Sequence, residues 1–511
     1  MEPEPLSNSH SGGYSFPIPE TRARKAAHSR PVSEGSVSID PLTRIFWALL
    51  IFSLPFNDIR FPKTAKSFGQ PSSYLAIVLW VFVLFRILQR KESLRFLKSK
   101  AFLFMFLFWV VAGISISLSS QAPPSPWIES SVWLKSIKQF AQLSVGLSIA
   151  FLTAFFVRSW RDFRFAMALY FAGWIGSVFA QALDFAAYFA GRGLLQEAND
   201  FIHYTRLWQF LGRSPRLRLS SQEASFAADY LLCLIPFFVL GAYYWKSRAW
   251  NVINSSVSVL VLFATMSFGG LAVFLGEAAL MAMVLGRRAV GLLALAGGAP
   301  LVLALAISPV YASFVWNRAV GVFDYGIETS DFSVRQRGAA AESAWTTFEG
   351  HPWLGVGIGN ASFYIMGDMP TWAAAQPDLR RVMLGPDQDA DPLFNEFLRV
   401  LSETGLVGTG LFVAMLATMV WGTFKAYRRT PEPWKKSVYA AILVALLGQI
   451  AHYTSMSEFS FRYWFFIWGL AICTVRLAGQ ADPCAPRPST MWRKELARTI
   501  TPTGIPALPT P

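Results

Sequence analysis

Twelve long runs of mostly apolar residues constrain the fold of this chain more than any other feature. A helix needs about 20 such residues to cross the hydrocarbon core of a membrane. The runs cover residues 43–57, 73–90, 101–119, 133–157, 163–190, 225–245, 250–267, 270–286, 289–308, 400–424, 437–455 and 460–478. Only 15% of the residues are charged, whereas a soluble domain carries about 25%. The sequence therefore predicts an all-α fold, a polytopic membrane bundle of about twelve transmembrane helices.

Every second connection between these runs is short and basic, and this pattern predicts the orientation of the chain in the membrane. These connections cover residues 90–100, 158–164, 246–248, 286–288 and 425–436. Because cytoplasmic loops are enriched in Lys and Arg, we expect these connections and both termini to be cytoplasmic. The same clusters account for the net charge of +14 without a nucleic-acid partner.

The predicted spans divide the chain into five segments. We expect disordered cytoplasmic tails at 1–42 and 479–511, because the first is rich in Pro, Ser, Gly and charge. Residues 43–308 are predicted to hold the first nine spans and a long outer loop at 191–224. Residues 309–399 form a large late outer loop with short helices, and residues 400–478 hold the last three spans.

Several cations lie on the predicted outer side, against the usual charge bias. The first long outer loop includes Arg216 and Arg218, and Lys135, Lys138 and Arg462 lie at the outer ends of spans. Lys135 and Lys138 are three residues apart and are expected to share a helix face. An anionic ligand would explain these cations, but attraction to lipid headgroups and snorkelling predict the same placement. The sequence leaves these interpretations open.

The large outer loop begins with a predicted helix and a glycine-rich turn. Residues 330–349 contain Ala and Glu, which favour a helix, together with Arg335 and Arg337. A glycine and a proline then end the helix. The turn GHPWLGVGIGN carries His351 and Gly357, and its glycines permit close backbone approach. We expect it to lie beside a sugar or diphosphate, or to pack against the bundle; without a preceding strand, it is not a nucleotide-binding loop.

The end of this loop leads directly into a span. In PLFNEFLRVLSETGLVGTG, Asn395 shares a helix face with later apolar residues, and Gly405 and Gly408 favour close helix packing. Glu403 is unusual so near the start of a helix of membrane length. We expect its carboxylate to accept hydrogen bonds from the loop and to orient an arginine rather than to act in catalysis.

Four ionisable residues lie inside apolar runs, namely Asp184, Asp229, Glu277 and His452. Such groups are costly in a membrane and usually face the interior of a bundle. The sequence does not indicate which of them are functional.

Together these features resemble the O-antigen ligase and polymerase superfamily. Arg337 lies fifteen residues before Pro352 of H-P-x-x-G-x-G-x-G-N, as in the family pattern. The family's second motif, N-x-x-L-x-x-L-x-E-x-G-x-x-G, matches from Asn395 through Glu403 to Gly408. Twelve spans, cytoplasmic termini and a large late periplasmic loop are also typical of the superfamily.

The sequence departs from the family at three positions. Phe394 stands where lipopolysaccharide ligases carry a loop histidine, which favours a polymerase. The stretch RLRLSSQEASFAADY resembles the entry to a span in polysaccharide polymerases, with Glu223 at the carboxylate position and Ala224 in place of a proline. Phe268 replaces the arginine of the family's Ser-Arg-Gly turn.

The resemblance implies that a glycan is transferred from undecaprenyl diphosphate at the periplasmic face of the bacterial inner membrane. Negative charge builds on the diphosphate as it leaves, and fixed cations stabilise that charge. Arginine stays charged and binds phosphate bidentately, so Arg337 is the first candidate. Further contacts are expected from Arg216, Arg218, Arg335, Lys135, Lys138, Arg462, Gly357 and Asn395.

The attacking hydroxyl also needs a general base. Glu223, at the mouth of a span, is the expected base, and His351 is the alternative. The three cysteines show no metal-ligand spacing, so we expect the transfer to need neither a metal nor a cofactor.

Three functions remain open. The first is a polymerase that joins lipid-linked repeat units of an exopolysaccharide or O-antigen. The second is a ligase that transfers finished glycan to a lipid or protein, and the third is a transporter or flippase. Transporters often contain related halves with broken spans, which are not evident here. Expected partners are the lipid-linked glycan, membrane lipids, a flippase and chain-length or export proteins.

Overall fold

A computed structural model describes most of the chain as helix. The described residues are 40–57, 70–89, 99–123, 131–189, 217, 219, 221, 223–241, 248–285, 332–383, 393–457, 459–478 and 480. Within these ranges no residue is in a β-strand. The prediction of an all-α, polytopic membrane fold is confirmed.

Each predicted span except 289–308, which lies outside the described residues, coincides with a helix. These helices are α2 (Pro41–Ser53), α3 (Pro71–Leu88), α4 (Lys100–Ser115), α5 (Val132–Phe156), α6 (Trp160–Phe189), α9 (Ala224–Gly241), α10 (Arg248–Ala264), α11 (Phe268–Leu285), α19 (Glu396–Arg429), α20 (Pro433–His452) and α21 (Arg462–Leu477). A short 3-10 helix, η3 (Ile116–Gln121), continues α4.

Six segments of the described chain are long and apolar enough to cross a membrane. They are Pro71–Leu88, Lys100–Gln121, Val132–Phe156, Trp160–Ala182, Ala224–Gly241 and Glu396–Arg429. Shorter apolar helices cover Pro41–Ser53, Ala249–Ala264 and Phe268–Val284. These lengths are those of a multi-pass membrane protein.

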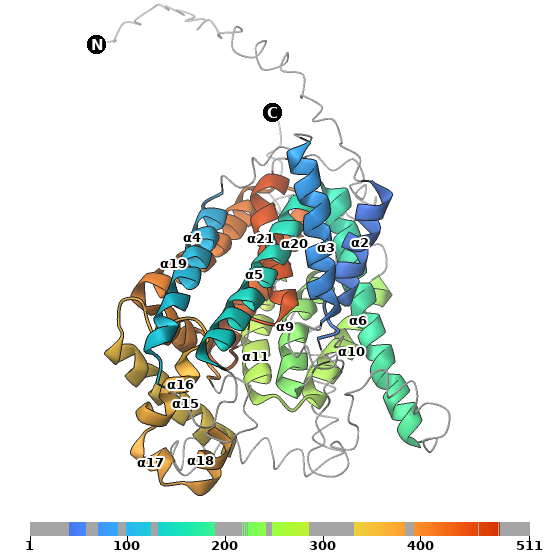
Figure 1. Cartoon of the computed structure of the whole chain (residues 1–511). Helices are drawn as coiled ribbons and strands as arrows, with labels where there is room; N and C mark the ends of the chain where they lie inside the picture. Colours follow the sequence, from blue (N-terminus) through green and yellow to red (C-terminus); the bar gives the residue numbers. More distant parts are fainter. Residues whose placement is uncertain are drawn as a thin grey trace, which may run out of the picture.

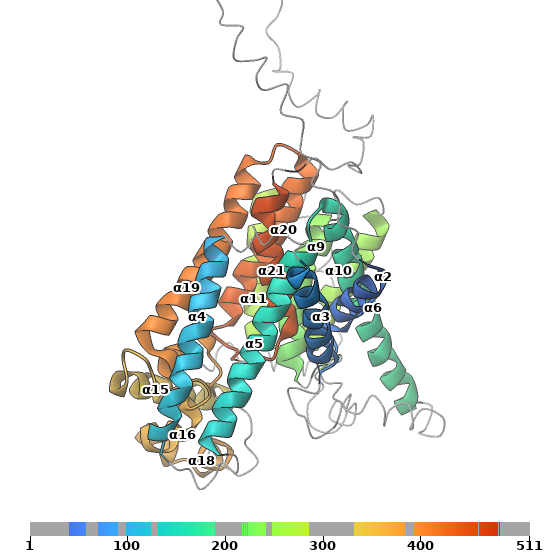
Figure 2. The ribbon, with the colours of Figure 1, turned by 45° about the horizontal axis from the view of Figure 1, so that its top comes forward.

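The interior of the bundle is built around α9, α20 and α21 (Figures 1 and 2). Every residue of α9 from Ala224 to Gly241 except Phe226 is buried, as expected for a helix that is apolar on all sides. Small residues bring α21 close to α5. A Cβ atom at Gly146 of α5 would lie 2.2 Å from the Phe465 ring of α21, and one at Gly469 would lie 2.7 Å from the Ala150 carbonyl oxygen. These contacts are the close helix approach that glycine permits in membranes.

Four further helices form a separate unit at one end of the bundle (Figure 1, yellow to orange). This loop unit consists of α15 (Phe332–Gly350), α16 (Ala361–Asp368), α17 (Thr371–Ala374) and α18 (Pro377–Met383). Its own small core contains Ala339, Ala340, Ala344, Val356, Ala361, Ile365, Ala373, Leu379, Met383 and Leu393. Because the three alanines of α15 have small side chains, the short helices pack closely on it. We call this end of the bundle the loop end.

Candidate functional site

The two sequence motifs of the late loop meet in a backbone joint at the loop end. The joint consists of residues 351–360, which follow α15, and residues 402–407 of α19. The Val356 and Gly357 amides donate to the carbonyl oxygens of Ser402 and Glu403, both over 2.9 Å. In return, the Leu406 and Val407 amides donate to the carbonyl oxygens of Pro352 and Trp353, over 2.8 and 3.2 Å.

These hydrogen bonds exist because α19 is broken at Gly405. Its φ of 63° and ψ of −165° are not helical and release backbone groups from their usual partners within the helix. A Cβ atom at Gly405 would lie 2.3 Å from the Trp353 carbonyl carbon, and one at Gly355 would lie 2.5 Å from the Ser402 carbonyl oxygen. Both positions require glycine, because φ is positive and the opposing backbone is in contact. The expected close approach of the glycine turn is thus made to α19.

Side chains anchor the same turn to α4, η3 and α5. The Asn360 amide nitrogen donates to Ser119 Oγ over 3.0 Å, and its Oδ1 accepts from Ser136 Oγ over 2.7 Å. Ser115 Oγ accepts from the Ile358 amide over 3.0 Å. Asn360 is completely buried. The turn is therefore held by both backbone and side-chain contacts.

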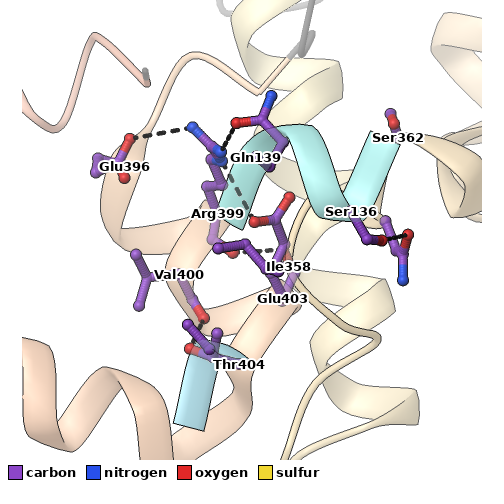
Figure 3. Close-up of polar contacts among 12 residues, drawn as sticks. Ser136, Gln139, Ile358, Ser362, Glu396, Arg399, Val400, Glu403 and Thr404 are labelled. Atoms are coloured by element: carbon purple, nitrogen blue, oxygen red, sulfur yellow. Dashed lines mark hydrogen bonds and ion pairs between the residues drawn. The ribbon is translucent and has the colours of Figure 1, made fainter. Parts of the chain in front are cut away.

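A buried ionic cluster lies beside the joint (Figure 3). We call it the Arg399 cluster; it contains Glu396, Arg399 and Glu403 of α19 and Gln139 of α5. Arg399 donates to Gln139 Oε1 over 2.9 Å and to Glu403 Oε2 over 3.4 Å, and its Nη1 lies 3.7 Å from Glu396 Oε2. Arg399 also covers the Phe459 ring at 4.6 Å. The three charged side chains are at most 1% exposed.

The Glu403 carboxylate pairs with an arginine, as expected, but that arginine belongs to the same helix. The hydrogen bond from the loop is accepted by the backbone carbonyl of Glu403, whereas the prediction concerned its carboxylate. Sequence analysis nevertheless missed Arg399. It precedes Glu403 by one helical turn, and that spacing alone could have identified it.

Arg337 lies at the opposite end of α15 from the joint. Its guanidinium carbon is 5.4 Å from the centroid of the Phe394 ring. Phe394 is directly followed by Asn395, which caps α19 by accepting from the Leu398 amide over 3.0 Å. The structure thus places a half-buried arginine above the start of α19. Asn395, a predicted substrate contact, acts here as a helix cap.

Arg335 is held within the loop unit. It donates to Asp378 Oδ2 over 3.0 Å and to the Gln376 side chain. Arg335 and Arg337 therefore differ in their contacts. Arg335 joins α15 to the residues around the start of α18, whereas Arg337 faces the Phe394 ring before α19. These contacts give Arg335 a structural role in the loop unit.

The two lysines of α5 do not share an environment. Lys135 is 5% exposed, donates to Ser362 Oγ and lies 5.4 Å from the Phe363 ring. Lys138 is exposed. Because Lys135 is buried under α16 and Lys138 is not, the expected shared face does not form a two-lysine site. Lys135 instead helps to bind the loop unit to the bundle.

Arg462 is the first residue of α21 and is completely buried. Its Nη1 donates to the carbonyl oxygens of Gln142 and Phe459, both over 2.9 Å, and its Nε lies 3.4 Å from Ser73 Oγ. These contacts connect α21 to α5 and α3. These contacts give Arg462 a structural role at the loop end.

The two predicted bases belong to different segments, one just before α9 and the other just after α15. Glu223 is exposed at the start of α9 and accepts a 3.0 Å hydrogen bond from Ser225 Oγ. The His351 ring packs edge-on against Tyr364 at 5.5 Å. Burial, with a contribution from the Asp368 carboxylate, raises the pKa of Tyr364, so this phenol stays neutral. Arg216 and Arg218 lie outside the described residues.

Of the predicted contacts, Gly357 lies in the joint itself. A Cβ atom there would be 2.6 Å from the Ser115 carbonyl oxygen. In the described part of the chain, no group of three or more His, Cys, Asp or Glu side chains is arranged to hold a metal ion.

Comparison with known proteins agrees with these features. Residues 252–413 match the model of a family described as O-antigen ligase. The match includes α15, the joint and the three charged residues of the Arg399 cluster. A comparison with curated proteins found no match.

Proposed function

Because residues 252–413 resemble the O-antigen ligase and polymerase superfamily, we propose that this multi-pass membrane protein is a lipid-linked glycan polymerase. Its donor would be a glycan on undecaprenyl diphosphate, and its acceptor a sugar hydroxyl of a second lipid-linked repeat unit. The reaction would take place at the loop end, on the periplasmic face of the bacterial inner membrane. The proposal needs no metal.

The observation that carries the proposal is the position of Arg337. Its half-buried guanidinium lies over Phe394, next to the cap of α19. In the transfer, the acceptor oxygen bonds to the anomeric carbon as the bond from that carbon to the diphosphate oxygen breaks. The diphosphate leaves with the electron pair, and Arg337 stabilises the charge through two parallel hydrogen bonds. The sequence predicts that Glu223, or alternatively His351, takes the proton of the attacking hydroxyl.

Phe394 favours a polymerase over a ligase. It occupies the position of the ligase loop histidine, and here its ring supports Arg337. Transfer to a lipid or protein acceptor is the second candidate function. A deletion strain distinguishes the two, because loss of a polymerase leaves single repeat units, whereas loss of a ligase leaves full-length polymer on the carrier lipid.

The decisive variant is Arg337→Ala, with Arg380→Ala as the matched control. Arg380 is an exposed arginine of α18 in the same loop unit. We expect Arg337→Ala to lower polymer yield per membrane-inserted molecule about 100-fold or more, as for loss of one transition-state donor. Arg337→Lys should recover part of the activity, because a point charge cannot form both hydrogen bonds. Yield near that of wild type in Arg337→Ala would refute the role of Arg337 in the transfer.

A further inference from the structure

Two of the ionisable residues inside apolar runs form a buried carboxylate–imidazole pair at the loop end, apart from the site residues described above. Asp229 of α9 and His452, the last residue of α20, are 0% and 1% exposed. Their Oδ1 and Nδ1 atoms are 2.7 Å apart. The two residues are 223 positions apart in sequence, so the pair exists only because α9 packs along α20.

Other donors fix the state of this pair. Asp229 Oδ2 accepts from the Tyr463 hydroxyl over 2.9 Å and from Trp464 Nε1. Because both oxygens of Asp229 face donors, we assign the ring hydrogen of His452 to Nδ1, which donates to Oδ1. The lone pair is then on Nε2.

The Nε2 atom faces the first turn of α11. A Cβ atom at Gly269 would lie 3.8 Å from His452 Nε2 and 2.9 Å from Ser455 Oγ. Gly269 contributes no side chain, so this edge of the imidazole meets backbone rather than a bulky group. Among the described residues, no hydrogen bond of Nε2 is found. Titratable and aromatic groups around the pair include Tyr170, Tyr230, Cys233, Glu277, Tyr453, Tyr463 and Trp464.

His452 is connected to the start of α19 through the backbone of its neighbour. The residues that follow it cap α19, since the Glu396 amide donates to the Tyr453 carbonyl oxygen over 2.8 Å. Glu396 follows the Phe394–Asn395 segment beneath Arg337. On the other side, Asp229 is six residues after Glu223, or about 9 Å along a helix. The pair is thus linked through Tyr453 and Glu396 to the segment beneath Arg337, and along α9 to Glu223.

We propose that His452, oriented by Asp229, accepts the proton of the attacking sugar hydroxyl. This inference rests on the proposed transferase function. As the acceptor oxygen bonds to the anomeric carbon and the diphosphate leaves with its electron pair, the hydroxyl proton passes to Nε2. Asp229 stabilises the imidazolium that forms. Glu223 is exposed and His351 packs on a tyrosine, so neither shows a carboxylate partner of this kind.

The test uses purified full-length protein in lipid nanodiscs with a synthetic undecaprenyl-diphosphate oligosaccharide as donor and acceptor. We expect His452→Ala to lower the rate about 100-fold or more. Added imidazoles of increasing basicity should restore activity in proportion to their basicity, because they replace a proton acceptor. Gln449→Leu, which changes another buried polar residue of α20, is the control and should keep most activity.

A second pair of variants leaves the dyad intact. Gly269→Ala places a methyl group 3.8 Å from Nε2 and 2.9 Å from Ser455 Oγ, whereas Gly276→Ala, on the same helix, adds one where no atom lies within 4 Å. We expect a rate at least tenfold lower for Gly269→Ala only. This arm decides the question even where His452→Ala fails to fold.

The outcomes separate the two proposals. Failure of the wild-type protein to release carrier diphosphate would refute the transferase function and this inference with it. An active wild type with equal rates for the two glycine variants would overturn the inference alone. A folded but inactive His452→Ala that no imidazole restores would also overturn it, because a purely structural histidine behaves in this way.

Discussion

Two buried polar clusters at the loop end are stabilised in different ways. One is the Arg399 cluster, and the other is the Asp229 cluster, which consists of Asp229, His452, Tyr463 and Trp464. Both bury ionisable groups at the loop end of an apolar bundle. Three members of the Arg399 cluster come from a single helix, α19, and lie beside its break. The Asp229 cluster joins three helices, and its carboxylate accepts from three donors.

The difference indicates what each cluster contributes. The Arg399 cluster combines two carboxylates with one guanidinium, so its stability depends on a single cation. In the Asp229 cluster, one carboxylate accepts hydrogen bonds from several donors, so loss of any one donor leaves the others in place. We therefore expect removal of the single cation to destabilise the protein strongly, and removal of one donor to Asp229 to destabilise it only slightly.

The largest effect should come from Arg399→Ala. Removing the guanidinium leaves Glu396 and Glu403 buried without their shared cation, at a cost of about 3–5 kcal/mol. The measurement is the thermal unfolding midpoint and folded yield of the detergent-solubilised protein. Arg428→Ala, an exposed arginine of the same helix, is the control and should change stability by about 0.5 kcal/mol or less.

A second variant tests whether charge is the cause. In Arg399→Met combined with Glu396→Gln and Glu403→Gln, the unpaired charges are gone, and much of the lost stability should return. If Arg399→Ala is as stable as Arg428→Ala, the cluster does not hold the break in place.

The next largest effect is expected at the break itself. Gly405→Ala forces a Cβ atom to within 2.3 Å of the Trp353 backbone at a positive φ, which costs about 2–3 kcal/mol. Gly410→Ala, in the same helix with no atom within 4 Å of its Cβ position, should be neutral or stabilising. Equal unfolding midpoints for the two variants would contradict the structure of the joint.

Much of the fold was predictable from the lengths of the apolar runs. Each of the helices α2 to α6, α9 to α11 and α19 to α21 coincides with an apolar run that is long enough to form a helix of the bundle. The break at Gly405 was not predictable in the same way. The sequence predicted close packing there, but whether a glycine packs or breaks a helix depends on the segment opposite it. That segment, around Trp353, lies about fifty residues earlier in the chain.

The site was predictable to the extent that its contacts are local. The role of Glu403 followed from its place near the start of a long helix. The difference between Lys135 and Lys138 did not, because the burial of Lys135 depends on Ser362 of α16. Asp229 and His452 were recognised as buried ionisable groups, but a pairing across 223 residues leaves no local pattern.

The smallest effect tests the distributed cluster. Tyr463→Phe removes one of the three donors to Asp229 and leaves His452 and Trp464 in place. Because the lost bond is to a charged group, we expect a loss of about 1.5 kcal/mol. Combining Tyr463→Phe with Asp229→Asn gives a double-mutant cycle, in which the Tyr463 effect should shrink once the carboxylate is gone. An equal Tyr463 effect in both backgrounds would mean that its ring packing, rather than its hydroxyl, stabilises the protein. A loss as large as that of Arg399→Ala would mean that Tyr463 is indispensable to Asp229, and the contrast between the two clusters would fail.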